Sequence, residues 1–145
     1  MVQRTLFIIK PDAIRRGLAS SILKDIRDSR LRILVQKKIK LSRSILEQLY
    51  EIHKGKSFYE NLMKYMSSGA SICAVVEGVG AIDRLRELMG DTYPSRAAEA
   101  SIRGKYKTES DTGPSGAIEN MVHGSDGERE AKFEIELIFG KEWAV

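Results

Sequence analysis

The chain has 145 residues, of which 42% are hydrophobic and 30% charged, with a formal net charge of +4. This composition excludes a disordered chain, and the length predicts one domain, residues 1–145, with a single core. No apolar run is long enough to span a bilayer and the first residues lack the apolar core of a signal peptide, so we expect a cytoplasmic protein with no membrane partner.

The charge is divided unevenly along the chain. Residues 1–54 contain 13 Lys and Arg against 5 Asp and Glu, a balance of +8, and residues 55–145 contain 11 against 15, a balance of −4. The basic part could hold a polyanion such as nucleic acid, or a small anionic ligand, or it could be a solvated surface. Charge alone leaves these alternatives open.

A short β-favouring run, Thr5 to Ile9, predicts a buried strand that ends at Lys10-Pro11-Asp12. A lysine at the end of a buried strand can reach into the ligand crevice of a sheet, although most such lysines are solvated. The next segments predict a helix and then a half-exposed strand with a basic outer face. The helix carries Ala19, Ile22, Leu23 and Ile26 on one side, and the strand alternates from Ile33 to Leu41.

Ser44 followed by Glu47 is a capping-box pattern, and it predicts a helix that runs to about His53 with Ile52 facing inward. His53 is expected at the surface, in a turn. The helix after this turn starts near Phe58. An aromatic residue at such a position usually belongs to the core, but it can also be half exposed and offer its face to a base.

The run from Ala70 to Val76 predicts the centre of the sheet, and its Cys73, the one cysteine of the sequence, is expected to be a buried hydrophobe. A helix follows and closes at Gly90, with Arg86 on its outer face. From Gly90 to a strand-like segment near Ile118 the chain has no regular pattern. Long irregular segments of this kind are usually functional or mobile.

The predicted order is strand, helix, strand, two helices, strand, helix, strand, helix. This order is typical of an α+β, ferredoxin-like (split βαβ) fold with extra helices, in which a four-stranded antiparallel sheet carries helices on its faces. Many unrelated activities use this architecture, so the fold alone leaves the function open.

The stretch from Asn120 to Asp126 places His123 between a strand and a helix. Ser125 and Glu128 form a second capping-box pattern, so we expect His123 just before a helix N-terminus, where backbone N–H groups favour a phosphoryl group. Gly124 would keep the approach open. A neutral imidazole is also a nucleophile, but a histidine at a strand end is more often a structural residue.

Several motifs, taken together and in order, resemble the nucleoside diphosphate kinase family over nearly the whole chain. They are Lys10-Pro-Asp, Arg16-Gly-Leu, Tyr50, Phe58, Met66-x-x-Gly, Arg86 before Gly90-x-Thr-x-Pro, Ile102-Arg-Gly and Asn120-x-x-His-Gly-Ser-Asp. The resemblance implies a ping-pong transfer of the γ-phosphate from a nucleoside triphosphate, such as ATP, to a nucleoside diphosphate.

The resemblance also implies a role for each site residue. His123 would accept the phosphoryl group, and Glu134 would bind the other ring N–H of its imidazole, unless Glu134 is a solvent-facing residue. Lys10 and Asn120 would hold the ribose 3′-hydroxyl, and Lys10 would also meet the transferred phosphate. The remaining expected residues are the phosphate ligands Arg86, Thr92 and Arg103, the base-stacking Phe58, and Tyr50 and Ser125 around the phosphohistidine. Mg²⁺ would be held mainly by phosphates and water, with no protein cage.

The sequence departs from the family pattern in three places. Lys56-Ser57-Phe58 stands where Arg-Pro-Phe is usual, and Ala98 to Ser101 lacks a usual proline. The segment from Lys105 to Glu119 is longer than usual and polar, with Gly113-Pro114-Ser115-Gly116 at its middle. We expect this segment to be an exposed hairpin or loop that decorates the surface and is partly disordered, because it offers little apolar surface to bury.

The alternative is a nucleic-acid-binding or regulatory module on the same fold. The basic second strand supports it, but sheet-based RNA readers need exposed aromatics on the central strands, and Ala70 to Val76 has none. We therefore rank the enzyme first and expect no nucleic-acid partner.

The resemblance implies a homo-oligomer, and we expect a hexamer, with a tetramer as the main competitor. Light scattering at micromolar concentration should give the mass of six chains. The mass of a single chain, about 16 kDa, would contradict the expectation.

Overall fold

The computed structural model describes residues 1–144 and contains one four-stranded antiparallel sheet with the order β2-β3-β1-β4. Its elements are β1 (Val2–Ile9), α1 (Pro11–Arg15), α2 (Ala19–Asp28), β2 (Arg32–Ile39), α3 (Arg43–Leu49), η1 (Glu51–His53), α4 (Tyr59–Met66), β3 (Ser71–Val79), α5 (Ala81–Met89), η2 (Pro94–Arg96), α6 (Ile102–Lys105), β4 (Val122–Gly124), α7 (Glu128–Phe139) and η3 (Lys141–Trp143). The predicted ferredoxin-like fold is confirmed.

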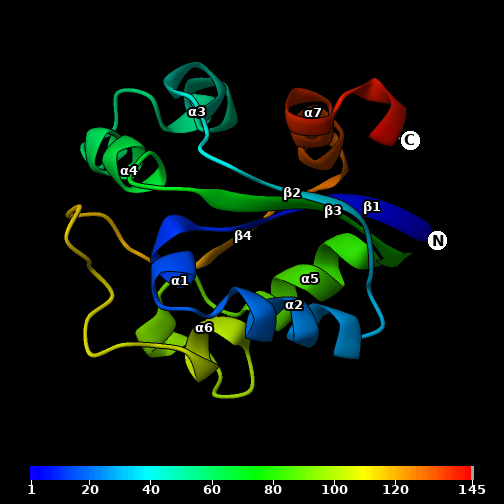
Figure 1. Ribbon diagram of the computed structural model, residues 1–145, viewed down its shortest axis with the longest axis horizontal. Coiled ribbons are helices and arrows are strands. Elements are labelled where there is room, and N and C mark those ends of the chain that lie inside the picture. The colour runs from blue at the N-terminus through cyan, green and yellow to red at the C-terminus, as the bar shows by residue number, and fades with distance from the viewer. Residues whose placement is uncertain (145) are drawn as a thin grey trace.

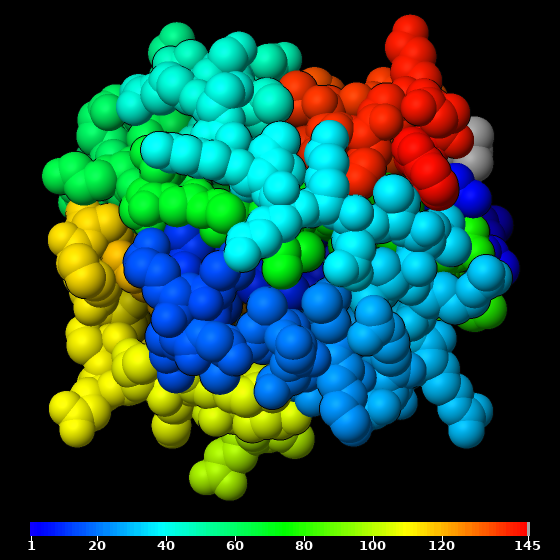
Figure 2. Space-filling model, viewed as in Figure 1, coloured from blue at the N-terminus to red at the C-terminus, as the bar shows by residue number. Residues whose placement is uncertain are grey.

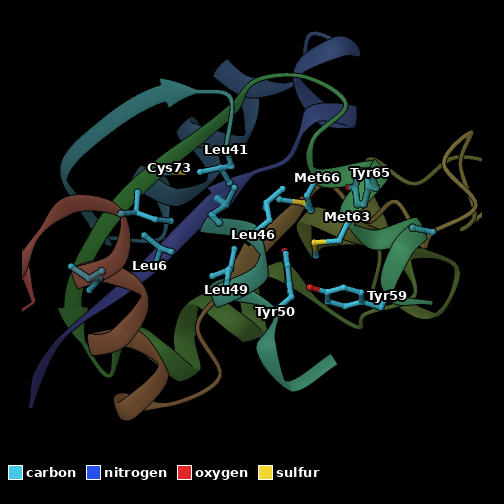
Figure 3. Packing of buried hydrophobic residues seen from close by; sticks show 14 of the residues in the cluster. Leu6, Leu41, Leu46, Leu49, Tyr50, Tyr59, Met63, Tyr65, Met66 and Cys73 are labelled. Carbon is cyan, nitrogen blue, oxygen red and sulfur yellow. The ribbon is translucent and has the colours of Figure 1, made fainter. Parts of the chain in front are cut away.

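Helices cover both faces of the sheet (Figure 1): α3, α4 and α7 lie on one side, and α1, α2, α5 and α6 on the other. Both inner strands are apolar on both faces, so each face has to be covered. Side chains alternate across a strand, and Leu6 and Ile8 therefore join the core under α3, α4 and α7, while Phe7 and Ile9 join the core against α2 and α5. Figure 3 shows the first of these two cores, in which Leu46 and Met66 from the helices lie with Leu6 and Cys73 from the strands.

Some local expectations are wrong. The N-cap of α3 is Ser42, whose hydroxyl accepts from the Ile45 N–H at 3.2 Å, so the pattern at Ser44 does not cap the helix. Ser42 has the extended backbone of a cap, and Ser44 is already inside the helix. Because α3 ends at Leu49, the expected inward residue Ile52 is 73% exposed.

The predicted capping box at Ser125 does not form either. α7 begins at Glu128 with Gly127 as its N-cap. Ser125 is fully buried because it continues the pairing of β4 with β1, and its hydroxyl accepts from the Leu6 N–H at 3.3 Å. His123 therefore lies in a strand opposite Ile8, and the expected position just before a helix N-terminus is wrong.

The segment from Lys105 to Glu119 leaves α6 at Lys105 and forms the expected hairpin over Asp111 to Glu119, where hydrogen bonds hold it. Thr112 and Ile118 form a bridge, and the Asp111 carboxylate accepts from the N–H and hydroxyl of Ser95 at 2.9 and 2.5 Å. Ala117 is buried in the core. Figure 2 shows the hairpin, in yellow, on the surface beside α1 and α4. The composition conceals this order because it comes from local polar contacts.

The backbone of Gly104 in α6 packs closely against the backbone of Ala98, so a substitution at Gly104 tests this part of the fold. A Cβ atom at Gly104 would lie 2.0 Å from the Ala98 carbonyl oxygen. Gly104→Ala should therefore lower the free energy of unfolding by about 2 kcal/mol or more, measured by urea denaturation.

The matched control for this variant is Gly69→Ala. The nearest atoms to a Cβ at Gly69 are 3.7 Å away, an ordinary contact, so this change should stay within about 0.5 kcal/mol of wild type. Equal urea midpoints for the two variants would contradict the close packing at Gly104.

Candidate active site

His123 and Glu134 form a hydrogen-bonded pair between β4 and α7. The Nε2 atom of half-buried His123 lies 2.8 Å from Oε1 of Glu134, and Glu134 is 7% exposed. An ionised carboxylate only accepts, so Nε2 carries the proton and the lone pair is on Nδ1. The Ser125 hydroxyl donates to the same carboxylate oxygen at 2.7 Å. The pair therefore orients an imidazole whose Nδ1 is basic and nucleophilic, and the solvent-facing alternative for Glu134 is wrong.

Tyr50, which follows α3, places its ring edge-on to His123 with the ring centroids 6.2 Å apart. Its hydroxyl is buried and has no hydrogen-bond partner within residues 1–144. Burial raises the pKa of Tyr50, and the charge of Glu134 raises it further. The hydroxyl thus stays protonated, as a donor available beside the imidazole.

Lys10 and Asn120 meet at the end of the paired strands β1 and β4. The Lys10 ammonium donates to the Asn120 side-chain oxygen at 2.7 Å, and the Asn120 amide donates to the Thr92 carbonyl at 3.1 Å. Lys10 is 6% exposed, and its pKa is lowered to about 7, mainly by burial and also by the nearby charge of Arg103, while Asp12 opposes the shift. A buried, poorly compensated cation of this kind favours an anionic ligand.

Arg103 is buried in α6 and is bound by backbone carbonyls. It donates to Asn120 at 3.2 Å, to Gly90 at 3.0 Å and to Val122 at 2.8 Å. Burial lowers its pKa to about 10. Since a guanidinium has five N–H donors, two remain for a ligand. Arg103 therefore fixes the backbone around His123 and keeps spare donors, a structural function that the sequence did not reveal.

Arg86 and Thr92 lie at the exposed side of the site. The Arg86 guanidinium donates to the Asp126 carbonyl at 3.4 Å and pairs with its carboxylate at 3.7 Å, and half of the Arg86 side chain is exposed. Thr92 is exposed, and its carbonyl holds Asn120. Both residues are free to meet a ligand that approaches from solvent.

Phe58 precedes α4 and is 45% exposed. The His53 ring lies edge-on to it, with centroids 5.1 Å apart, and the Lys56 ammonium lies 5.9 Å from its centroid. His53 also stacks on Tyr50 at 6.2 Å. His53 ends η1 as a partly exposed residue, and it lies within an aromatic row that runs from Phe58 to Tyr50.

Gly124 has a packing function rather than the expected open approach. A Cβ atom there would lie 2.8 Å from the Met89 sulfur and 3.2 Å from a Leu85 methyl. The missing side chain thus allows β4 to pack against α5, which brings His123 close to the helix that carries Arg86.

A cavity of about 380 Å³ lies between α1 and the hairpin, and His123 does not line it. Its wall includes Asp12, Arg15, Arg16, Glu119 and Met121. The site is therefore defined by the contacts of His123, whose side chain is 16% exposed, and not by this hollow.

One residue that sequence reasoning did not single out, Tyr65, supports the site from behind. The buried Tyr65 hydroxyl of α4 contacts Asp12 and the backbone of Met121. The available signal was weak: a tyrosine on the inward side of a helix requires a partner for its hydroxyl, but the sequence does not say which one.

Within residues 1–144, no group of three or more His, Cys, Asp and Glu side chains is arranged to hold a metal ion. In the same part of the chain, no helix combines the length and apolar character needed to cross a membrane.

Comparison with known proteins identifies the family. The family model described as "Nucleoside diphosphate kinase" matches residues 3–143. The chain belongs to the nucleoside diphosphate kinase family. It is 40% identical over 144 residues to the nucleoside diphosphate kinase of Sulfurisphaera tokodaii, covering 99% of this chain and 93% of that protein. It is 42% identical over 139 residues to the one of Nitratidesulfovibrio vulgaris, covering 96% and 95%.

Solved structures of the nucleoside diphosphate kinase family share the fold over the full chain. The Aquifex aeolicus enzyme superposes with a TM-score of 0.88 at 32% identity, covering all of both chains. The Borrelia burgdorferi enzyme was solved as a transition-state mimic with bound vanadate and ADP. It superposes with a TM-score of 0.90 at 28% identity, covering 99% of this chain and 90% of that one. Phosphotransfer between nucleotides is the activity of this enzyme class.

The buried amine of Lys10 predicts a pH dependence of stability. Between its folded pKa of about 7 and the ordinary 10.5, the unfolded chain binds this proton and the folded chain does not, so Lys10 makes stability rise with pH across this window. Lys10→Met should be the more stable protein by up to a few kcal/mol at pH 7 and below, and this gain should shrink toward about pH 10.

Urea unfolding of both proteins across this pH range measures the effect. Lys38→Met is the control, because Lys38 is exposed and its ammonium stays in water in the folded state. A gain for Lys10→Met that does not change with pH would contradict the buried amine.

Proposed function

We propose that His123 carries the phosphoryl group in a ping-pong transfer of the γ-phosphate from a nucleoside triphosphate to a nucleoside diphosphate, within one domain that spans residues 1–145. The observation that carries the proposal is the hydrogen bond of 2.8 Å between Nε2 of His123 and Glu134. This bond leaves the Nδ1 lone pair of an oriented imidazole free to attack, which is the first requirement of nucleophilic catalysis.

In the first half-reaction, Nδ1 of His123 attacks the γ-phosphorus in line. The N–P bond forms while the bond from phosphorus to the bridging oxygen of the β-phosphate breaks, and the diphosphate leaves with both electrons of that bond. Glu134 stabilises the charge that develops on the ring through the Nε2 proton, as the orienting carboxylate of a catalytic histidine does. The second half-reaction is the reverse, with a different diphosphate as acceptor.

Lys10 and Asn120 supply the contacts to the sugar and the transferred group. Their side chains already meet at 2.7 Å, and each retains further hydrogen-bonding capacity for the ribose 3′-hydroxyl. The lowered pKa of Lys10 adds a specific feature: an arriving triphosphate compensates the buried charge, so binding should raise this pKa and take up a proton.

Arg103, Arg86 and Thr92 are the proposed phosphate ligands. Phosphoryl transfer depends mainly on positioning and on neutralising the charge spread over non-bridging oxygens, and two cations with one hydroxyl suit this task. Arg103 is already fixed by three carbonyls, so it supplies its remaining donors without losing mobility on binding. Arg86 has to exchange its weak contacts with Asp126.

Phe58 is the proposed stacking surface for the base. Its half-exposed ring is supported on the other side by His53, and stacking tolerates any base because every base has a π-face. Broad nucleoside specificity follows. Tyr50 and Ser125 complete the surroundings of the phosphohistidine, Tyr50 with a hydroxyl that has no partner among residues 1–144, and Ser125 through Glu134.

Mg²⁺ is the proposed cofactor. The site contains donors for phosphate and no protein cage for a cation within the described residues, which fits an ion held by phosphate oxygens and water. When bound, Mg²⁺ would neutralise part of the phosphate charge.

The oligomeric state and the location remain proposals: a hexamer, with a tetramer second, in the cytoplasm. The basic surface of β2 is engaged within the chain at two of its cations, while Lys38 stays exposed, so charge alone does not decide against the nucleic-acid alternative. Lys37 donates to the Ile138 carbonyl at 2.7 Å and lies over the Phe139 ring, and Arg32 pairs with Glu77 at 3.7 Å.

Trapping of labelled phosphate tests the role of His123. With γ-labelled ATP and Mg²⁺ the wild-type chain should become labelled and then pass the label to an added diphosphate. His123→Gln should lose both steps while it keeps the fold, because the change removes the nucleophile and leaves the phosphate ligands.

The other histidine provides the control: His53→Gln should still trap label on the protein. Phosphotransfer by His123→Gln at more than a small fraction of the wild-type rate would overturn the proposed mechanism.

A further inference from the structure

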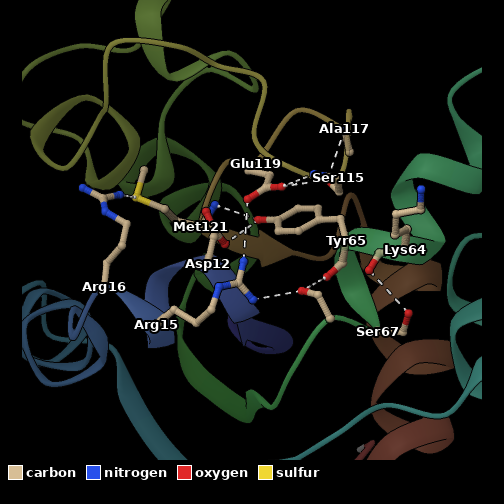
Figure 4. A network of polar contacts seen from close by, with 11 residues as sticks. Asp12, Arg15, Arg16, Lys64, Tyr65, Ser67, Ser115, Ala117, Glu119 and Met121 are labelled. Atoms are coloured by element: carbon tan, nitrogen blue, oxygen red, sulfur yellow. Dashed lines mark hydrogen bonds and ion pairs between the residues drawn. The ribbon is translucent and has the colours of Figure 1, made fainter.

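Tyr65 connects three segments behind the site (Figure 4). It is fully buried in α4, and its hydroxyl donates to Oδ1 of Asp12 at 2.6 Å. The Tyr65 hydroxyl oxygen also accepts from the backbone N–H of Met121 at 3.3 Å. The ring lies under Lys10, with the ammonium 5.4 Å from the ring centroid. The Tyr65 side chain thus contacts Asp12, which follows β1, and Met121, which directly precedes β4.

Met121 is the unusual residue in this arrangement. Its φ is +73°, in the left-handed region that residues other than glycine rarely adopt, and the Val122 N–H closes a tight turn on the Asn120 carbonyl at 2.8 Å. Such a turn is strained and persists only when its surroundings hold it. It joins Asn120 to the strand that carries His123, so its shape sets the distance between these two side chains.

The contacts of Met121 show what holds this strained turn. The Met121 carbonyl accepts from the Lys10 N–H at 2.8 Å, and the Arg16 guanidinium approaches its sulfur at 3.4 Å. The Met121 N–H has the Tyr65 hydroxyl as its partner. Burial raises the pKa of Tyr65, and Asp12 raises it further, so the hydroxyl keeps the proton that it donates to Asp12.

We propose that Tyr65, with Asp12 as its acceptor, is a positioning residue for phosphoryl transfer: its hydroxyl fixes the Met121 turn and so places His123 relative to Asn120 and Lys10. This inference rests on the proposed role of His123. It differs from a stabilising role in the core, because it predicts a loss in the transfer step beyond any loss of stability.

Two buried tyrosines of α4 allow a matched comparison. Tyr65→Phe removes the hydroxyl that holds Met121, while Tyr59→Phe removes a buried hydroxyl that has no hydrogen-bond partner within residues 1–144. In single-turnover labelling of the folded proteins, Tyr65→Phe should form the phosphoenzyme roughly tenfold more slowly, since small displacements of reacting groups cost this much or more. Its KM for nucleotide should change less than the rate does, and Tyr59→Phe should match wild type in both.

A stability control separates positioning from general weakening. Ile22→Val in α2 creates a small cavity in the core on the other face of the sheet. It should lower the urea midpoint and leave the labelling rate unchanged. The labelling rates of Tyr65→Phe and Ile22→Val are compared in the same buffer, under conditions in which both proteins are fully folded.

Asp12 provides a second test that does not depend on Tyr65→Phe being folded. Asp12→Asn and Asp12→Ala remove the same charge, but only asparagine keeps a carbonyl oxygen that can accept from the Tyr65 hydroxyl. Asp12→Asn should therefore label severalfold faster than Asp12→Ala. Equal rates for this pair, or a Tyr65→Phe rate equal to that of Tyr59→Phe, would overturn the proposal. Absence of label on the wild-type chain would instead overturn the role of His123.

Discussion

The site depends on the pairing of β1 with β4. Three residue pairs join these strands, with Ile8 opposite His123, and the pairing is extended at both ends by contacts from Lys10 to Met121 and from Ser125 to Leu6. Strands cannot shift by one residue without turning every side chain to the other face. This register therefore fixes, in one step, that His123 faces Glu134 and that Lys10 meets Asn120, which lies 110 positions away in the sequence.

Burial of two cations is the second constraint. Lys10 and Arg103 lie in the interior of the protein. Asp12 is the carboxylate that opposes the lowering of the Lys10 pKa, and it also accepts a hydrogen bond from the Tyr65 hydroxyl. Neutral oxygens from Asn120 and from backbone carbonyls compensate the two cations instead. The pKa values of Lys10 and Arg103 are both lowered, and the two cations can still attract an anionic ligand. If each cation were paired with a carboxylate instead, that attraction would already be neutralised.

Where the sequence departs from the family pattern, other contacts within the chain support the same segments. Without the usual proline before Phe58, the ring is supported by His53 and Lys56. In the segment that lacks the other proline, Ser101 caps α6 by accepting from the Gly104 N–H at 3.1 Å. The long hairpin is tied to η2 through Asp111 and Ser95, so the extra residues brace the segment that carries Thr92.

The sequence by itself determined the sheet and its helices, since apolar alternation and the Gly90 cap are local signals. It also predicted His123, Lys10 and Asn120 as site residues through their motifs, and Glu134 through the family resemblance. Tertiary structure decided what local patterns could not: that Ser125 serves Glu134 instead of capping α7, that Gly124 is a packing residue, and that Tyr65 and Asp12 hold the Met121 turn. The physical reason is that a buried polar group takes whichever partner the fold brings within hydrogen-bonding distance, and these partners are up to 56 residues apart in sequence.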